Sequence, residues 1–393
     1  MKTVLRRLLK ALGYLLGFFV LLALGFYAWL VIANWNDAPL SEDTKRALQY
    51  TPPTEEQLQD NGFLIISGLD APFTADEEDA VAPAIALGRQ RLTREIERHA
   101  WVQANPNTTE GMPPTIDGAK GGSDILPTAL RCPPGEGDCF SWYQQKRASF
   151  EAQITHYRPL LQRANAAAQA KQFNNPLPFY LYADLPRYAW LMRTQELSLA
   201  LATLQWLDGQ PEKAAATVTQ ISVLRQRLAE SSNNLVTSMI ALAMHYQELR
   251  WLSNAADRIG PQTPASVTQQ IDALLAPSPP TLHSALEGEK HFISSIYYSI
   301  RDSKSSGLFS SPWDDAPPWG ERAMDRITGV GFLPNETINH AVKRMGDIQR
   351  IGDLPSHEQE SAFSKYMSTN PTTQLASTRC SPCATRWVDV SAP

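Results

Sequence analysis

Sequence patterns typical of β-strands are missing from this chain. No stretch shows sustained alternation of apolar and polar residues with β-branched enrichment, which excludes a fold built mainly from sheet. Apolar residues recur instead at helical spacing, and residues 187–208 are apolar almost all round, which indicates a central helix. That helix is expected to stop at Asp208-Gly209, because Pro211 is a favoured first residue for the next one.

A third helix is predicted from about Asn234. One stripe of it carries Leu235, Met239, Leu242, Tyr246 and Leu249. Consecutive antiparallel helices with short turns are typical of helical-repeat arrays, although these three share no residue identities that would establish a repeat. We therefore predict an all-α fold, an antiparallel helical array that is helical-repeat-like in its centre.

Motifs that would assign an enzyme class are also missing. The chain has no G-x-S-x-G elbow and no phosphate-binding loop, and Gly329-Val330-Gly331 does not continue as a dinucleotide fingerprint. Two carboxylates of a glycosidase site would meet only in space, so the 40 acidic residues cannot be narrowed to a pair. The catalytic residues are therefore unknown, and no cofactor is expected.

An excess of basic residues is lacking as well. The chain has 35 Lys+Arg and 40 Asp+Glu, and Lys2, Arg6, Arg7 and Lys10 lie before the first acidic residue, Asp37. The part after Ala33 therefore keeps 31 basic against 40 acidic residues, a formal charge of −9. A body of this charge has no electrostatic footprint for nucleic acid, so we expect no nucleic-acid partner.

Charged residues are absent from residues 11–33, a run of 23 made mostly of Leu, Phe, Val, Ile, Ala and Gly. A helix of this length reaches about 34 Å, enough to cross a hydrocarbon core of about 30 Å. The basic flank before it predicts a cytoplasmic N-terminus, with the rest of the chain across the membrane. The alternative is a cleaved signal peptide ending at Val31-Ile32-Ala33, although its apolar core is usually only ~7–15 residues long.

The predicted domain organisation follows from this helix. We expect a cytoplasmic stub (1–10), a transmembrane helix (11–33), a linker (34–53), a periplasmic all-α domain (54–370, with a sub-boundary at 173–186) and a disordered tail (371–393). The tail has no apolar period, which favours disorder. An out-of-frame ending of a longer protein is the second interpretation.

Cysteine is scarce, with 4 residues in the chain. Cys132 and Cys139 bracket a short Pro/Gly loop, and cysteines this close usually pair in an oxidising compartment, so we predict a structural disulfide. Cys380 and Cys383 have redox-motif spacing, but no strand or helix context precedes them. Ala384 stands where a haem-attachment motif needs His.

The candidate metal ligands are His283, Glu287 and His291, spaced four residues apart on a helix expected over 281–304. The apolar residues of that helix centre on its opposite side, so we expect these three to be solvated, with a surface zinc site as the alternative. His245 and Glu248 supply only half of a zinc-hydrolase helix motif. No metal is therefore expected.

Two tryptophans, Trp313 and Trp319, lie in the Pro-rich acidic stretch SSPWDDAPPWGER. Exposed Trp can anchor a protein partner or stack on a sugar. The alternative, which we favour, is that both rings fold back onto the helices.

A basic tip, one apolar span and a helical body near 187–258 resemble uncharacterised single-span, periplasm-facing α-helical envelope proteins of Gram-negative bacteria. The likeness rests on layout, so it implies a fold and an inner-membrane location but no activity. We expect an interaction or scaffold protein that contacts the bilayer through residues 11–33 and a protein partner in the envelope. The alternatives are an envelope hydrolase that uses carboxylates or a His/Glu metal site, and a thiol-redox protein built on Cys380 and Cys383.

Overall fold

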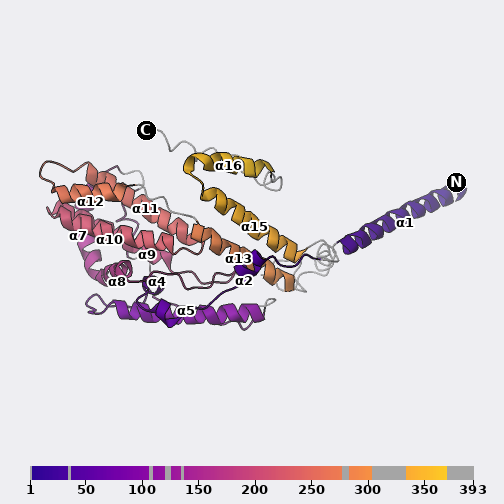
Figure 1. Cartoon of the computed structure of the whole chain (residues 1–393), viewed down its shortest axis with the longest axis horizontal. Coiled ribbons are helices and arrows are strands. Elements are labelled where there is room, and N and C mark those ends of the chain that lie inside the picture. Colours follow the sequence, from indigo (N-terminus) through magenta and orange to yellow (C-terminus); the bar gives the residue numbers. More distant parts are fainter. Residues whose placement is uncertain are drawn as a thin grey trace.

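The computed structural model describes residues 2–33, 37–105, 109–119, 125–133, 137–276, 283–302 and 333–369, and this part of the chain is all α-helical, without a strand. The all-α prediction is confirmed. The first helices are α1 (Lys2–Ala33), α2 (Glu42–Leu48), α3 (Glu55–Leu58), α4 (Gly62–Ser67), α5 (Val81–Ala104), α6 (Cys139–Gln145), α7 (Arg147–His156) and α8 (Arg158–Gln169). The later helices are α9 (Tyr188–Leu207), α10 (Pro211–Glu230), α11 (Leu235–Ala256), α12 (Ala265–Leu275), α13 (His283–Asp302), α15 (Pro334–Gly352) and α16 (Ser356–Thr369) (Figure 1).

The N-terminal helix α1 stands apart from the packed helices (Figure 1). None of its apolar stretch Leu12–Trp29 is buried inside the protein, and the stretch is long and apolar enough to cross a membrane. A signal sequence meets the same conditions, so the structure establishes an exposed apolar helix at this end and no more.

The centre of the body is the array α9, α10 and α11. Residues on every side of α9 are buried, among them Leu191, Leu197 and Leu204, as its apolar composition predicts. Gly209 closes the turn to α10 with a positive φ of 72°, a conformation that favours glycine, and Pro211 begins α10. The sequence therefore predicts this hairpin correctly.

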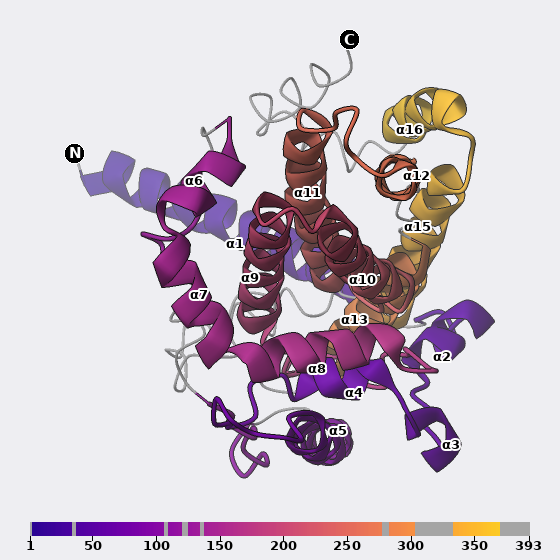
Figure 2. The same ribbon diagram turned by 90° about the vertical axis from the view of Figure 1, so that its left-hand side faces the viewer.

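A second layer covers one end of that array. Figure 2 shows α8 and α4 lying between α5 on one side and α9 and α10 on the other. The helices α4 and α5 cross very closely, because a Cβ at Gly68 or Gly88 would overlap the facing backbone. Short apolar α4 is entirely buried, so the layer depends on this close approach.

Buried arginines bind the loop between α4 and α5. Arg163 is fully buried and donates to the carbonyl oxygens of Leu69, Ala71 and Ala80 at 2.9, 2.7 and 2.6 Å. Arg91 forms two hydrogen bonds to the Asp70 carboxylate, at 2.5 and 2.9 Å. These guanidinium groups satisfy carbonyls and a carboxylate that would otherwise be buried without partners, which is costly.

A third layer consists of α13, α15 and α2. The start of α13 lies beside the end of α15, as the contact between His283 and Asp353 shows, so these two helices are antiparallel. Residues 42–48 of the predicted linker form α2, which packs against both. The predicted tail 371–393 lies outside the described residues.

Candidate functional site

A cleft of about 730 Å³ lies between α2, α13 and α15. Leu177, Phe179 and Val342 give it apolar surface, and charged and amide side chains surround them. The polar residues that line it include Asp43, Arg46, Asn175, Asn233, His283, Glu287, Lys290, His291, Lys343, Gln349, Arg350 and Asp353.

Polar contacts near the start of the body position two walls of the cleft. Asp37 accepts hydrogen bonds from the backbone N–H groups of Asn335 and Glu336 at 2.7 and 3.1 Å, which caps the start of α15. The Asn339 side-chain oxygen accepts from the Ser41 backbone and the buried Thr44 hydroxyl, both at 2.8 Å. The residues before and within α2 are therefore fixed to α15.

A close helix approach builds the back of the cleft. A Cβ at Gly288 would overlap the backbone of Asn233, so only glycine lets α13 lie this close to the start of α11. The Glu289 carboxylate accepts from the backbone N–H of Leu235 at 2.9 Å, and Asn175 donates to the Asn233 side chain at 2.6 Å. The floor of the cleft is thus anchored to the central array.

A chain of hydrogen bonds crosses from α13 to α15. Lys290 donates to the Gln349 oxygen at 2.5 Å and to Glu287 at 2.6 Å. With that oxygen occupied, the Gln349 amide nitrogen donates to His283 Nε2 at 2.9 Å. His283 Nδ1 then carries the proton and lies 3.3 Å from both oxygens of Asp353.

The carboxylate of Glu287 is held ionised by this network. Burial opposes ionisation, but hydrogen bonds from Lys290 and Gln349 outweigh it and hold the pKa of Glu287 below its usual value. Most charges in the cleft are similarly paired: Arg46 contacts Asp43, and Arg350 contacts Asp347. Such a lining offers alternating charges and amides rather than a field of one sign.

The expected solvation of the three candidate ligands is wrong for His291. Its Nδ1 contacts the carbonyl oxygen of Ala47, its ring lies 6.3 Å from the ring of His99, and its Nε2 is buried without a hydrogen-bond partner. Ala47 of α2 and His99 of α5 cover His291, and the sequence of α13 alone does not reveal that cover. His283 and Glu287 do keep about half of their side chains exposed, at 52% and 53%.

No metal site forms from these residues. Among the described residues no group of three His, Cys, Asp or Glu is placed to hold a metal ion. His283, Glu287 and His291 each bond to a different neighbour instead. Burial lowers the pKa of His291, and it lowers the pKa of His99 to about 4, with the neighbouring His291 adding to that shift. Both imidazoles are therefore neutral at pH 7.

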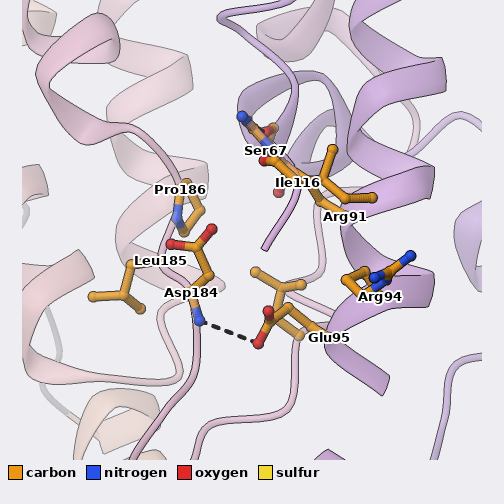
Figure 3. Close-up of a pocket in the computed structure, with 9 residues that line it drawn as sticks. Ser67, Arg91, Arg94, Glu95, Ile116, Asp184, Leu185 and Pro186 are labelled. Carbon is orange, nitrogen blue, oxygen red and sulfur yellow. Dashed lines mark hydrogen bonds between the residues drawn. The ribbon is translucent and has the colours of Figure 1, made fainter. Parts of the chain in front are cut away.

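A second hollow beside α5 brings two carboxyl residues together, as Figure 3 shows for Glu95 and Asp184. Its volume is about 10 Å³, room for one water molecule. Burial raises the pKa of Glu95 against the effects of the Asp184 backbone N–H, Arg98 and the Tyr180 hydroxyl, which bind its carboxylate at 3.1, 2.9 and 3.0 Å. A hollow of this size is too small to receive a substrate.

The partial metal motif on α11 serves the fold. Glu248 is 2% exposed and accepts from Arg225 at 2.8 Å, inside the array of α9, α10 and α11. Burial raises the pKa of Glu248 to about 7, although Arg225 opposes the shift. His245 lies 3.8 Å from the same carboxylate. The sequence motif therefore marks a buried ion pair.

Cys132 and Cys139 form the predicted disulfide, with their Cα atoms 5.6 Å apart. Asn254 accepts from the backbone N–H of Cys139 at 2.8 Å, and Arg250 donates to the carbonyl of Pro133 at 2.6 Å, so α11 holds both ends of the bridge. Trp313, Trp319, Cys380 and Cys383 lie outside the described residues.

Sequence reasoning missed the partners that shape the cleft, chiefly Lys290, Gln349 and Asp353. His283 and Asp353 are 70 residues apart, and no local pattern joins them. The only local signal is Gly288 in the middle of a helix, since such a glycine often marks a close packing contact. Neither a known protein family, nor a curated protein, nor a solved structure matches the chain.

Proposed function

We propose that this protein is a membrane-anchored helical interaction protein of the bacterial cell envelope, with α1 in the inner membrane and the body in the periplasm. The exposed apolar stretch of α1, the basic residues in the first turns of that helix and the disulfide support that location. Cytosolic proteins rarely keep a disulfide, and an exposed apolar helix of this length needs lipid or a partner.

The cleft between α2, α13 and α15 is the proposed binding site, and its size and lining are the observation that carries the proposal. A volume of about 730 Å³ lies within the roughly 300–1,000 Å³ of ligand sites. Apolar surface from Phe179 and Val342 beside paired charges and amides suits a short peptide segment, which presents apolar side chains and backbone polar groups together. We therefore expect a protein partner to insert such a segment.

Photo-cross-linking in cells tests this site. A photoreactive residue at Lys343, whose side chain is 78% exposed at the cleft, should capture a partner protein, whereas one at the exposed Lys213 of α10 should not. Gly346 lines the cleft, and a Cβ there would meet only the ends of the Arg350 and Lys290 side chains, at 3.9 and 4.0 Å, so Gly346→Ala fits and leaves the site open while Gly346→Trp fills it. The proposal expects the Lys343 adduct to survive Gly346→Ala and to disappear in Gly346→Trp. Equal capture from both positions, or an adduct insensitive to Gly346→Trp, would contradict it.

An envelope hydrolase is the second candidate, and the pair His283–Asp353 favours it because a carboxylate orients the imidazole of many catalytic bases. As a base, His283 would use the lone pair of its Nε2 atom. In the structure this lone pair accepts a hydrogen bond from the side-chain amide of Gln349. Turnover assays of the purified protein with cell-wall or lipid substrates, with and without Zn²⁺, distinguish a hydrolase from an interaction protein. Turnover that is lost in His283→Ala would favour the hydrolase.

A further inference from the structure

One face of α11 is apolar, exposed and free of charge. Five of the nine large apolar residues that are exposed outside α1 in the described chain lie on this helix: Val236, Met239, Leu242, Tyr246 and Leu249. Met239 and Tyr246 are 68% and 69% exposed. The remaining exposed residues between positions 236 and 256 are Ala243, Ser253 and Ala256, so no charge interrupts the stripe. Surface helices of soluble proteins carry polar and charged residues on this side.

The stripe has a two-fold pattern. Its residues are placed symmetrically about the midpoint between Leu242 and Ala243, so that Val236 matches Leu249 and Met239 matches Tyr246. At 100° per residue, Met239 and Tyr246 lie within about 20° of each other around the helix, and Val236 and Leu249 diverge to opposite sides of that line. In an antiparallel copy packed about a two-fold axis at this midpoint, Met239 of each chain would therefore face Tyr246 of the other.

The centre and the ends of the stripe favour the same arrangement. Ala243 is the smallest side chain and lies next to the midpoint, where two helices cross most closely. Glu289 is bonded to Leu235 at one end, and Arg250 lies at the other end, where it donates to the carbonyl of Pro133. An antiparallel copy brings Arg250 of each chain near Glu289 of the other, so opposite charges meet across the axis.

We propose that a second copy of this chain covers the stripe, and that the protein forms an antiparallel two-fold dimer through α11. The stripe is about 20 Å long at 1.5 Å per residue, which places the interface at the small end of specific interfaces, below about 1,200 Å². Confinement of both copies to one membrane raises their effective concentration and compensates for the small area. The interface lies on α11 and uses no residue that lines the cleft, so it is independent of the proposed binding site and rests only on the proposed membrane anchor.

Disulfide cross-linking in native membranes tests the axis. In the full chain with Cys380→Ser and Cys383→Ser, Ala243→Cys should form a covalent dimer on mild oxidation, because the two copies of residue 243 lie beside the axis. Val236→Cys is the matched control: it is 42% exposed and belongs to the stripe, but in the antiparallel dimer its two copies lie about 20 Å apart at 1.5 Å rise per residue. Cross-linking at Ala243 alone supports the proposal. Cross-linking at both positions indicates a parallel pair and overturns the antiparallel arrangement.

Mass measurement of the full chain in detergent micelles tests the interface itself. Wild type should be dimeric, and the double variant Met239→Glu/Tyr246→Glu should dissociate at least tenfold more readily, because pairing would bury four carboxylates. Gln226→Glu, on an exposed position of α10, should leave the dimer intact, and circular dichroism should show unchanged helix content in all three. A wild-type monomer that also fails to cross-link at Ala243→Cys would overturn the proposal, and would mean that another segment, a lipid surface or a different protein covers the stripe.

Discussion

The central array and the third layer are stabilised by different interactions. In α9, α10 and α11 the helices bury apolar side chains on several sides, and the buried carboxylates of Glu196 and Glu248 are paired with Arg193 and Arg225. Helices α2, α13 and α15 meet through caps, amide networks and ion pairs around an open cleft. Apolar burial contributes more free energy per contact than partly exposed polar pairs. The third layer should therefore unfold before the array under denaturing conditions, which fits a layer that receives a partner.

Truncation of an apolar side chain in the array should have the largest effect. Leu197 on α9 is fully buried, so Leu197→Ala removes apolar burial and leaves a cavity, at a cost of about 3–5 kcal/mol of unfolding free energy. Val342→Ala on α15 is the comparison, because Val342 is 4% exposed but lies beside the cleft. Denaturant unfolding should show a global loss for Leu197→Ala and a smaller one for Val342→Ala. Equal losses of unfolding free energy in the two variants would contradict the proposed difference between the regions.

Acidification should loosen the contact between α5 and the third layer, where the ring of His99 lies 6.3 Å from the ring of His291 on α13. The unfolded chain protonates histidine near pH 6.5, whereas folded His99 stays neutral down to about pH 4. Between these values the unfolded state binds more protons, so the contribution of His99, on the order of 3 kcal/mol, is lost as pH falls. His99→Phe should flatten the dependence of the unfolding free energy on pH between these two values.

The effect of pH on stability that comes from Glu248 in the array has the opposite sign. Its folded pKa of about 7 lies above the ordinary carboxyl value, so the folded state binds more protons between about pH 4.5 and 7. Its contribution therefore improves as pH falls. Hydrogen exchange at pH 7 and pH 5 should show α13 losing protection relative to α9–α11; a uniform loss in both would contradict the comparison.

Removal of the disulfide should affect the array side alone. A bridge that closes a loop this short contributes roughly 2–3 kcal/mol by the chain-entropy estimate. Cys132→Ser/Cys139→Ser should lower the unfolding free energy by that amount and release the end of α11 that Asn254 and Arg250 hold. Faster hydrogen exchange in α15 as well would show that the two regions are coupled.

Loss of a single polar contact in the third layer should have the smallest effect. Asn339→Ala removes the acceptor of the Ser41 and Thr44 bonds, at a cost of about 1–2 kcal/mol confined to α2 and α15. His340→Ala, an exposed neighbour on the same helix, is the control. Hydrogen exchange in α2 should increase for Asn339→Ala only, and an unchanged α2 would show that other contacts hold it.

The sequence predicts local features well. The turn at Gly209, the start of α10 at Pro211 and the bridge between Cys132 and Cys139 depend on residues close along the chain. The third layer joins residues such as Ser41 and Asn339, which are 298 positions apart, so periodicity within one helix does not reveal it. For the same reason His291 was expected in solvent, because its covering helices come from elsewhere in the chain.

The stripe on α11 shows a related limit. Periodicity predicts that Met239, Leu242 and Tyr246 share a face, but it does not say what covers that face. The structure leaves it exposed within the described chain. An apolar face is therefore evidence for a contact, and whether the contact is internal or between copies depends on the rest of the fold.

The topology of the mature protein in spheroplasts tests the central claim most directly, since α1 is proposed to hold a helical body outside the cytosol. Intact N-terminal sequence, resistance to carbonate extraction and cleavage of the body by external protease are the predicted results. A mature protein that begins at Asn34 and washes freely from membranes, or a body that external protease cannot reach, would contradict the account.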